Sequence, residues 1–161
     1  MSMRFGRDAV MAVKTALVNN WASMAATINA KYADGINVIA PATWYTSRIG
    51  DQQVPSVPAV FVLSGPGEHR GMDIANNWET TRTVFVAILV EDPDPNTLQE
   101  LIWRNKEVAG NILENWAVSG LDAQRYFVTG VRDAESGLFE KDNNYFTQDG
   151  VIEITLQSIE G

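Results

Sequence analysis

Residues 81–90 carry the feature that most restricts the fold, a strand-like run that is apolar on both of its faces. Valine and isoleucine occupy its even positions from 84 onward, and Phe85, Ala87 and Leu89 stand between them. Such a run predicts a strand in a sheet that is covered on both sides. Helices of the same chain can cover one side. A neighbouring copy of the same protein is the simplest candidate for the other side.

The first helix is predicted from a regular apolar stripe over residues 8–31. Apolar side chains recur there at spacings of three and four, which places them on one face of a helix. Asp8 is positioned to cap its start, and Gly35 lies just beyond its end, where a left-handed residue commonly closes a helix. The stripe consists of Val10, Val13, Leu17, Trp21, Met24 and Ile28.

A second amphipathic helix is predicted to follow the two-faced strand. Its start can be capped by a box of Thr97 and Glu100 or, one turn earlier, by Asp94 followed by Pro95. Gly120 is expected to close this helix.

The remaining apolar runs predict three further strands, at residues 59–63, 126–131 and 146–157. Two polar stretches between the predicted elements, residues 64–71 and 133–144, are expected to form turns or loops.

The last strand alternates apolar and polar residues, and Asp149-Gly150 is expected to interrupt it as a bulge or as a hairpin turn. Residues 36–55 are expected to be a loop or a short strand. Together the segments predict one α+β domain, residues 1–161. In it a mostly antiparallel sheet of about four to five strands packs against two main helices.

The composition argues against several classes of protein. A formal net charge of −8 and a pI near 4.5 disfavour a surface that neutralises nucleic-acid phosphates, although an acidic channel would let DNA pass. The absence of cysteine excludes disulfides and thiol catalysis. The chain shows neither a secretory signal nor a membrane-length apolar run, so we expect a soluble protein made in a cytosol, with no membrane partner.

The polar segments predict no catalytic, cofactor-binding or metal site, and we do not expect an enzyme. The glycine-rich run from Gly65 to Gly71 has neither the dinucleotide-binding nor the P-loop spacing. Its His69 is the only histidine, and the neighbouring Glu68 and Arg70 would point elsewhere in an extended loop. The acidic residues fail the EF-hand spacing, and a solvated loop with acids near a helix start accounts for them.

The five tryptophans divide by their positions. Trp21 and Trp116 fit helical apolar stripes and are predicted core residues, whereas Trp103 lies beside its stripe and could flank the core or meet a partner. Trp44 and Trp78 stand near polar loops, where both a core and an interface role remain open.

The whole pattern resembles a known family. A first amphipathic helix precedes a P-A-V-F-V strand and a W-E-T-T-R-T-V-F-V-A-I-L-V strand, and a second helix and paired strands ending in G-V-I-E-I-T-L-Q follow. This order over residues 8–157 is similar to that of the tail terminator and tail-completion (neck) proteins of long-tailed bacteriophages. No diagnostic short motif accompanies it.

The resemblance implies a virion protein, assembled in the host cytoplasm, that forms a ring, commonly of six copies, on the head-proximal end of the tail tube. The ring would end tube polymerisation and offer a surface for head–tail joining. Its partners would be further copies of itself, the tail tube protein and the head–tail connector, with DNA only passing through the lumen. No cofactor is implied. Candidate interface residues are Trp44, Trp78, Phe85, Leu89, Glu68, His69, Arg70, Phe139 and Tyr145.

Two alternatives stay open at the level of sequence. One is another phage head–tail connector or tail tube component of related fold. The other is a small ligand-binding or enzymatic α+β domain, which a pocket with converging polar groups would favour.

Overall fold

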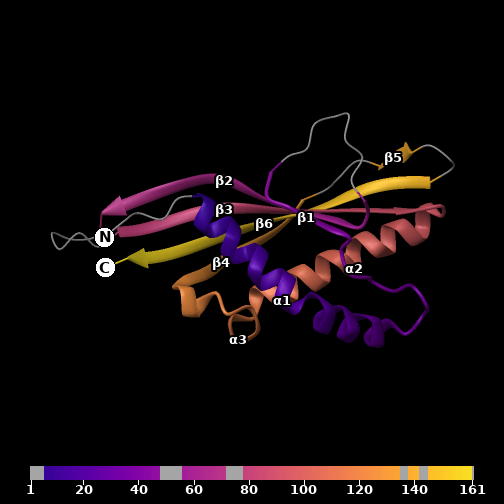
Figure 1. Cartoon of the computed structure of the whole chain (residues 1–161), viewed down its shortest axis with the longest axis horizontal. Helices are drawn as coiled ribbons and strands as arrows, with labels where there is room; N and C mark the ends of the chain where they lie inside the picture. Colours follow the sequence, from indigo (N-terminus) through magenta and orange to yellow (C-terminus); the bar gives the residue numbers. More distant parts are fainter. Residues whose placement is uncertain (1–5, 48–55, 72–77, 135–137, 142–144, 161) are drawn as a thin grey trace.

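The computed structural model describes residues 6–47, 56–71, 78–134, 138–141 and 145–160. They form a six-stranded sheet with two long helices (Figure 1). The α+β class predicted from the sequence is confirmed. In chain order the elements are α1 (Gly6–Tyr32), β1 (Thr43–Tyr45), β2 (Ala59–Gly71), β3 (Trp78–Asp92), α2 (Pro95–Glu114), α3 (Trp116–Ser119), a 3-10 turn (Asp122–Gln124), β4 (Tyr126–Ala134), β5 (Leu138–Lys141) and β6 (Tyr145–Glu160).

The two-faced strand β3 lies inside the sheet, with β2 on one side and β6 on the other, both antiparallel. β4 and β5 each pair with a different half of β6, also antiparallel. The short β1 runs parallel to the start of β2 and forms the opposite edge. The helix-covered face of a central strand is buried along its length. This explains why valine and isoleucine occupy the even positions of β3.

The hydrophobic core lies between the sheet and the two long helices. Val84, Val86 and Ile88 of β3 are at most 1% exposed, and they pack against the predicted stripes of α1 and α2. Burying a side chain of this size contributes about 1.5–3 kcal/mol to folding. The stripe predicted for α1 is confirmed, because Val10, Val13, Leu17, Trp21 and Ile28 are buried and Met24 packs against the core.

An ion pair joins α2 to the segment that follows α1. The guanidinium of Arg104, whose side chain is 4% exposed, donates two hydrogen bonds to the carboxylate of Asp34, at 2.7 and 2.6 Å, and one to the carbonyl oxygen of Ile36 at 2.6 Å. The same guanidinium lies 4.2 Å from the centre of the Tyr32 ring. Arg104 lowers the pKa of Asp34 to about 2 by hydrogen bonding to its charged form.

The helix ends differ in part from those predicted. α1 begins at Gly6, two residues before Asp8, so Asp8 lies inside the first turn and does not cap it. The residue directly after the helix, Ala33, has a φ of 49°, and Gly35 beyond it has a φ of 85°. Two left-handed residues therefore follow α1, and the alanine is the first of them.

Of the two predicted caps, α2 uses Asp94 followed by Pro95, and the box of Thr97 and Glu100 does not form its start. The Asp94 carboxylate accepts hydrogen bonds from the backbone nitrogen and the hydroxyl of Thr97, at 3.0 and 2.8 Å. The helix does not continue to Gly120 as predicted, because Asn115 is extended and ends it at Glu114. The four-residue α3 then leads to Gly120, which has a φ of 68°.

Three predictions about polar segments were wrong, and strand pairing explains each. Residues 64–71 continue β2 to its pairing of Gly71 with Trp78, after a bulge between Ser64 and Gly67. Part of the stretch 133–144 also forms strand, at the end of β4 and in β5. At Asp149-Gly150 β6 is unbroken, since both residues stay in register with β3. A neighbouring strand satisfies these backbone groups, so polar side chains do not end the strands.

Candidate functional site: the open face of the sheet

The face of the sheet opposite the helices carries an apolar patch. It is formed by odd-numbered residues of β1, β2, β3 and β6, whose even-numbered neighbours point into the core. We call this patch the open face. Its apolar members are Tyr45, Phe61, Leu63, Phe85, Ala87, Leu89 and Val151, all of intermediate exposure.

The strand register brings the members of the open face together. Phe61 of β2 pairs with Ala87 of β3, which pairs on its other side with Val151 of β6. One pair further along, Leu63 lies opposite Phe85. At the edge of the sheet the ring of Tyr45 stacks on that of Phe61, with centroids 4.9 Å apart and an angle of 15°. Cross-strand aromatic and aliphatic pairs of this kind stabilise the sheet by about 0.2–1 kcal/mol each.

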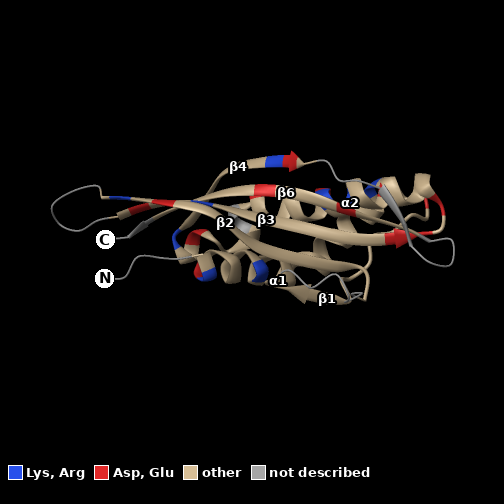
Figure 2. Cartoon of the chain, turned by 90° about the horizontal axis from the view of Figure 1, so that it is seen from above, with Lys and Arg blue, Asp and Glu red and all other residues tan. Residues whose placement is uncertain are grey.

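Charged residues border the open face. Phe85 lies opposite Glu153 in the register, and Leu89 lies opposite Asp149. Glu153 forms an ion pair of 3.7 Å with Arg132 of β4. Figure 2 shows the middle of β2 and β3 free of charged residues, with acidic residues at the far end of β3. An apolar centre with a charged border is typical of a protein interface.

Gly65 explains how Phe85 fits into this surface. A Cβ atom on Gly65 would lie 2.6 Å from Cε2 of Phe85, so the ring rests directly over the glycine of the adjacent strand. The sheet therefore explains the glycine at position 65. The Phe85 ring of the adjacent strand fills the space that a side chain at position 65 would take.

The nine predicted interface residues do not form one surface. Phe85 and Leu89 lie on the open face, as their parity indicated. Trp44 belongs to the opposite face, where its ring meets that of Trp21 edge-on at 5.7 Å and packs against the core. Trp78 begins β3 opposite Gly71.

The three polar candidates of the glycine-rich run lie near the end of β2. Glu68 and Arg70 are exposed, whereas His69 is half-buried and its Nδ1 lies 2.8 Å from Oγ1 of Thr80 on β3. Figure 1 shows this end of β2 and β3 continuing past the start of α1. The last two candidates, Phe139 of β5 and Tyr145 of β6, have side chains outside the described part of the chain.

Sequence reasoning missed the second half of the open face. Phe61 and Leu63 alternate with Val60 and Val62, which are fully buried. The run was predicted as an apolar strand, but its own two-faced character was not used. The parity argument applied to residues 81–90 also applies to residues 59–63. It would have added Phe61 and Leu63 to the predicted interface residues.

Two further observations concern the described residues. Among them no group of three or more histidine and acidic side chains is placed to hold a metal ion. None of the helices in the described ranges is both long and apolar enough to cross a membrane.

Comparison with known proteins finds likenesses among solved structures only. No protein-family model matches the chain, and no curated protein matches it. A solved structure described as "Virion of native gene transfer agent (GTA) particle" contains a similar chain, with a TM-score of 0.35 and 14% sequence identity. The likeness covers 88% of this chain and 92% of that one.

Proposed function

We propose that this protein is a structural, non-enzymatic subunit of a virion. In this proposal copies of the chain form a ring, commonly of six, at the head-proximal end of a phage tail tube. The ring ends polymerisation of the tube and provides the surface for head–tail joining. The tail tube protein and the head–tail connector are its partners, and DNA passes through the lumen without specific binding.

The open face is the observation that carries the proposal. One face of the sheet is closed by α1 and α2, and the other keeps the aromatic rings of Phe61 and Phe85 half exposed. Removing apolar surface from water contributes about 25 cal/mol per Å². A patch of this kind on a small domain commonly marks a contact with another protein. A further copy of the chain is the occupant that the resemblance in segment order suggests.

A ring needs two different patches on each subunit, because a head-to-tail contact joins unlike surfaces. The outward side of α1 supplies a suitable second patch. Met11 and Val18 on this side are 37% and 46% exposed, with Lys14 between them, and no further charged residue follows until Lys31. Packing this side of α1 on the open face of the next copy would repeat the helix-on-sheet contact that forms the core of each subunit.

The proposal is tested by the mass of the protein in solution, measured by light scattering after size exclusion over a concentration series. A closed six-fold ring has a mass of about 107 kDa, six times the 17.8 kDa of the chain. Leu89→Lys should abolish the large species, because it places a charge on the apolar patch of the open face. The fold should survive, since the new lysine lies opposite Asp149.

Val118→Lys is the matched control, because it puts the same charge on an exposed valine of α3, away from the open face. It should assemble like the unaltered protein. A two-fold dimer at every concentration would contradict the ring. Addition of the assembled protein to purified tail tubes then separates a terminator from a tube or connector component, since only a terminator stops tube growth.

A further inference from the structure

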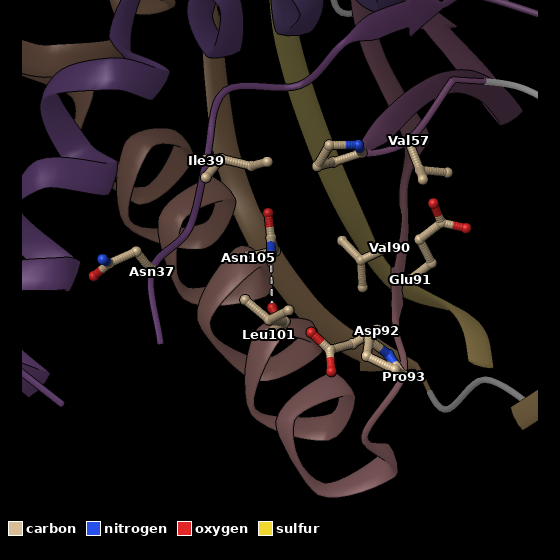
Figure 3. A pocket seen from close by; sticks show the side chains of 10 residues that line it. Asn37, Ile39, Val57, Val90, Glu91, Asp92, Pro93, Leu101 and Asn105 are labelled. Atoms are coloured by element: carbon tan, nitrogen blue, oxygen red, sulfur yellow. Dashed lines mark hydrogen bonds between the residues drawn. The ribbon is translucent and has the colours of Figure 1, made fainter. Parts of the chain in front are cut away.

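A pocket of about 410 Å³ lies on the helix side of the molecule, between the end of β3 and α2 (Figure 3). It is separate from the open face, and an inference from it does not rest on the ring. Its walls combine apolar side chains with polar ones, and carboxylates lie on one side. The lining residues are Asn37, Ile39, Val57, Pro58, Val90, Glu91, Asp92, Pro93, Leu101 and Asn105.

One wall of the pocket is fixed to α1 by side-chain hydrogen bonds. The amide of Asn29 accepts from the backbone nitrogen of Val38 at 2.8 Å and donates to its carbonyl oxygen at 3.0 Å. Arg104 holds the carbonyl of Ile36 at 2.6 Å. The backbone of this wall is therefore anchored, while the side chain of Ile39 is 60% exposed and has room to move.

Asn105 contributes an unsatisfied hydrogen-bond acceptor. The residue is 2% exposed, and its Nδ2 donates to the carbonyl oxygen of Leu101 at 2.7 Å. Its Oδ1 atom is buried and accepts no hydrogen bond from the described residues. Figure 3 shows this oxygen on the side away from Leu101, directed into the space beside Ile39. Leaving such an atom unpaired costs about 1–3 kcal/mol, which a donor in the pocket would recover.

The charged residues that line the pocket are acidic. The carboxylates of Glu91 and Asp92 line it, and none of its ten lining residues is basic. In Figure 3 the Asp92 side chain extends from the strand end toward α2, on the same side of the pocket as Pro93. An occupant that suits these walls carries a positive charge, several N–H donors and an aliphatic stem.

We propose that this pocket binds the side chain of an arginine presented by a partner protein. The methylene groups of such a side chain would pack between Ile39, Val57 and Leu101, as long basic side chains pack on apolar surface. Its guanidinium has five donors in a planar fork, enough for a carboxylate and for Oδ1 of Asn105 together. A lysine has a single charged nitrogen and cannot serve acceptors that lie on different walls as well. Oδ1 is covered in the free protein, so binding requires a small displacement of the side chains around it.

The test uses three blocked amino acids as probes, each titrated into ¹⁵N-labelled full-length protein. Nα-acetyl-arginine amide should shift the backbone amide signals of Glu91, Asp92 and Asn105. Nα-acetyl-citrulline amide keeps the shape and most donors without the charge, and should bind at least about threefold more weakly. Nα-acetyl-norleucine amide keeps only the stem and should cause no saturable shift. Equal shifts with all three probes would overturn the proposal. A fourth probe, Nα-acetyl-lysine amide, would overturn the choice of arginine if it bound as tightly as the arginine probe.

Variants locate the interaction within the pocket. Asn105→Leu removes the buried acceptor and should weaken the arginine probe about tenfold, while the protein melts no lower than before. Glu91→Gln and Asp92→Asn should each weaken it by a similar factor. Asp122→Asn is the control, because it neutralises a carboxylate outside the pocket. That carboxylate accepts a hydrogen bond of 2.8 Å from the backbone nitrogen of Ala123. Unchanged affinity in Asn105→Leu and Glu91→Gln together would refute the site.

Discussion

Gly65 provides a sharp test of the finding that the glycine-rich run is strand and not loop. A Cβ atom built on it would lie 2.6 Å from Cε2 of Phe85 and 2.9 Å from the backbone oxygen of Thr83. The phenyl ring can turn, but the oxygen belongs to the central strand and moves only if β3 moves. Gly130 in β4 is the matched control, because a Cβ there would lie 3.7 Å from Oγ1 of Thr155, which is an ordinary contact.

The expected magnitude follows from two opposing effects. Inserting a methyl group into a packed site costs about 1–3 kcal/mol. Replacing glycine by alanine also restricts the unfolded chain, which stabilises the protein by about 0.4–1 kcal/mol where the backbone allows it. Gly65→Ala should therefore lower the free energy of unfolding by about 1–2 kcal/mol. Gly130→Ala should leave it unchanged or raise it by up to about 1 kcal/mol.

Urea denaturation followed by tryptophan fluorescence measures both changes. It should be run at protein concentrations where light scattering finds only the monomer, so that assembly does not add to stability. If Gly65→Ala unfolds at the same urea concentration as Gly130→Ala, the close approach of β3 to Gly65 is wrong. An exposed loop would tolerate the methyl group at both positions equally.

Three further predictions concern the helices and the core. Asp94→Ala removes the cap of α2 and should lower the melting temperature by about 2–4 °C, measured by circular dichroism, whereas Thr97→Val should cost less because the backbone hydrogen bond remains. Val86→Ala empties a fully buried site in β3 and should cost about 2 kcal/mol in urea denaturation. The folded-state pKa of Asp34 is depressed to about 2, so its contribution to stability is present above its ordinary value of 3.8 and is lost as the pH falls toward 2. Urea midpoints between pH 5 and 2 should therefore fall more steeply for the unaltered protein than for Asp34→Asn, and parallel curves would contradict the ion pair.

The order and type of the long elements could be predicted because their patterns are local. The stripe of α1 and the alternation in β3 and β6 are each visible within a single segment. Two-sided apolarity in residues 81–90 also led to Phe85 and Leu89 as candidate interface residues, and the structure places both on the face opposite the helices.

The polar strand ends could not be predicted, because their reason lies in partner strands far along the sequence. Residues 67–71 are glycine-rich and charged, and they pair with residues 78–82 only because both extend β-sheet pairing that begins in the core. The β6 pair Asp149-Gly150 has a turn-like sequence, but Gly150 lies under Lys106 and Ile102 of α2, where a Cβ would approach to 2.9 and 3.0 Å. Tertiary contact, not turn formation, explains that glycine.

The pocket at Asn105 was also hidden from the sequence. Asn105 fell on the apolar stripe predicted for α2, where a polar residue gives no sign of which way its oxygen points. The structure shows that the carbonyl oxygen of Leu101 satisfies the amide nitrogen, while the buried amide oxygen has no partner among the described residues. A pocket built from four separate segments has no local signature.

The central claim, that the open face becomes buried between copies of the chain, is tested most directly by thiol labelling. The chain contains no cysteine, so Leu89→Cys gives a single thiol on the open face and Val118→Cys gives a single thiol away from it. Maleimide labelling rates of the assembled and the dilute protein are then compared. The account predicts that the thiol at position 89 reacts more slowly in the assembled protein, while the thiol at position 118 reacts at the same rate in both. Equal rates at position 89 in the two states would contradict it.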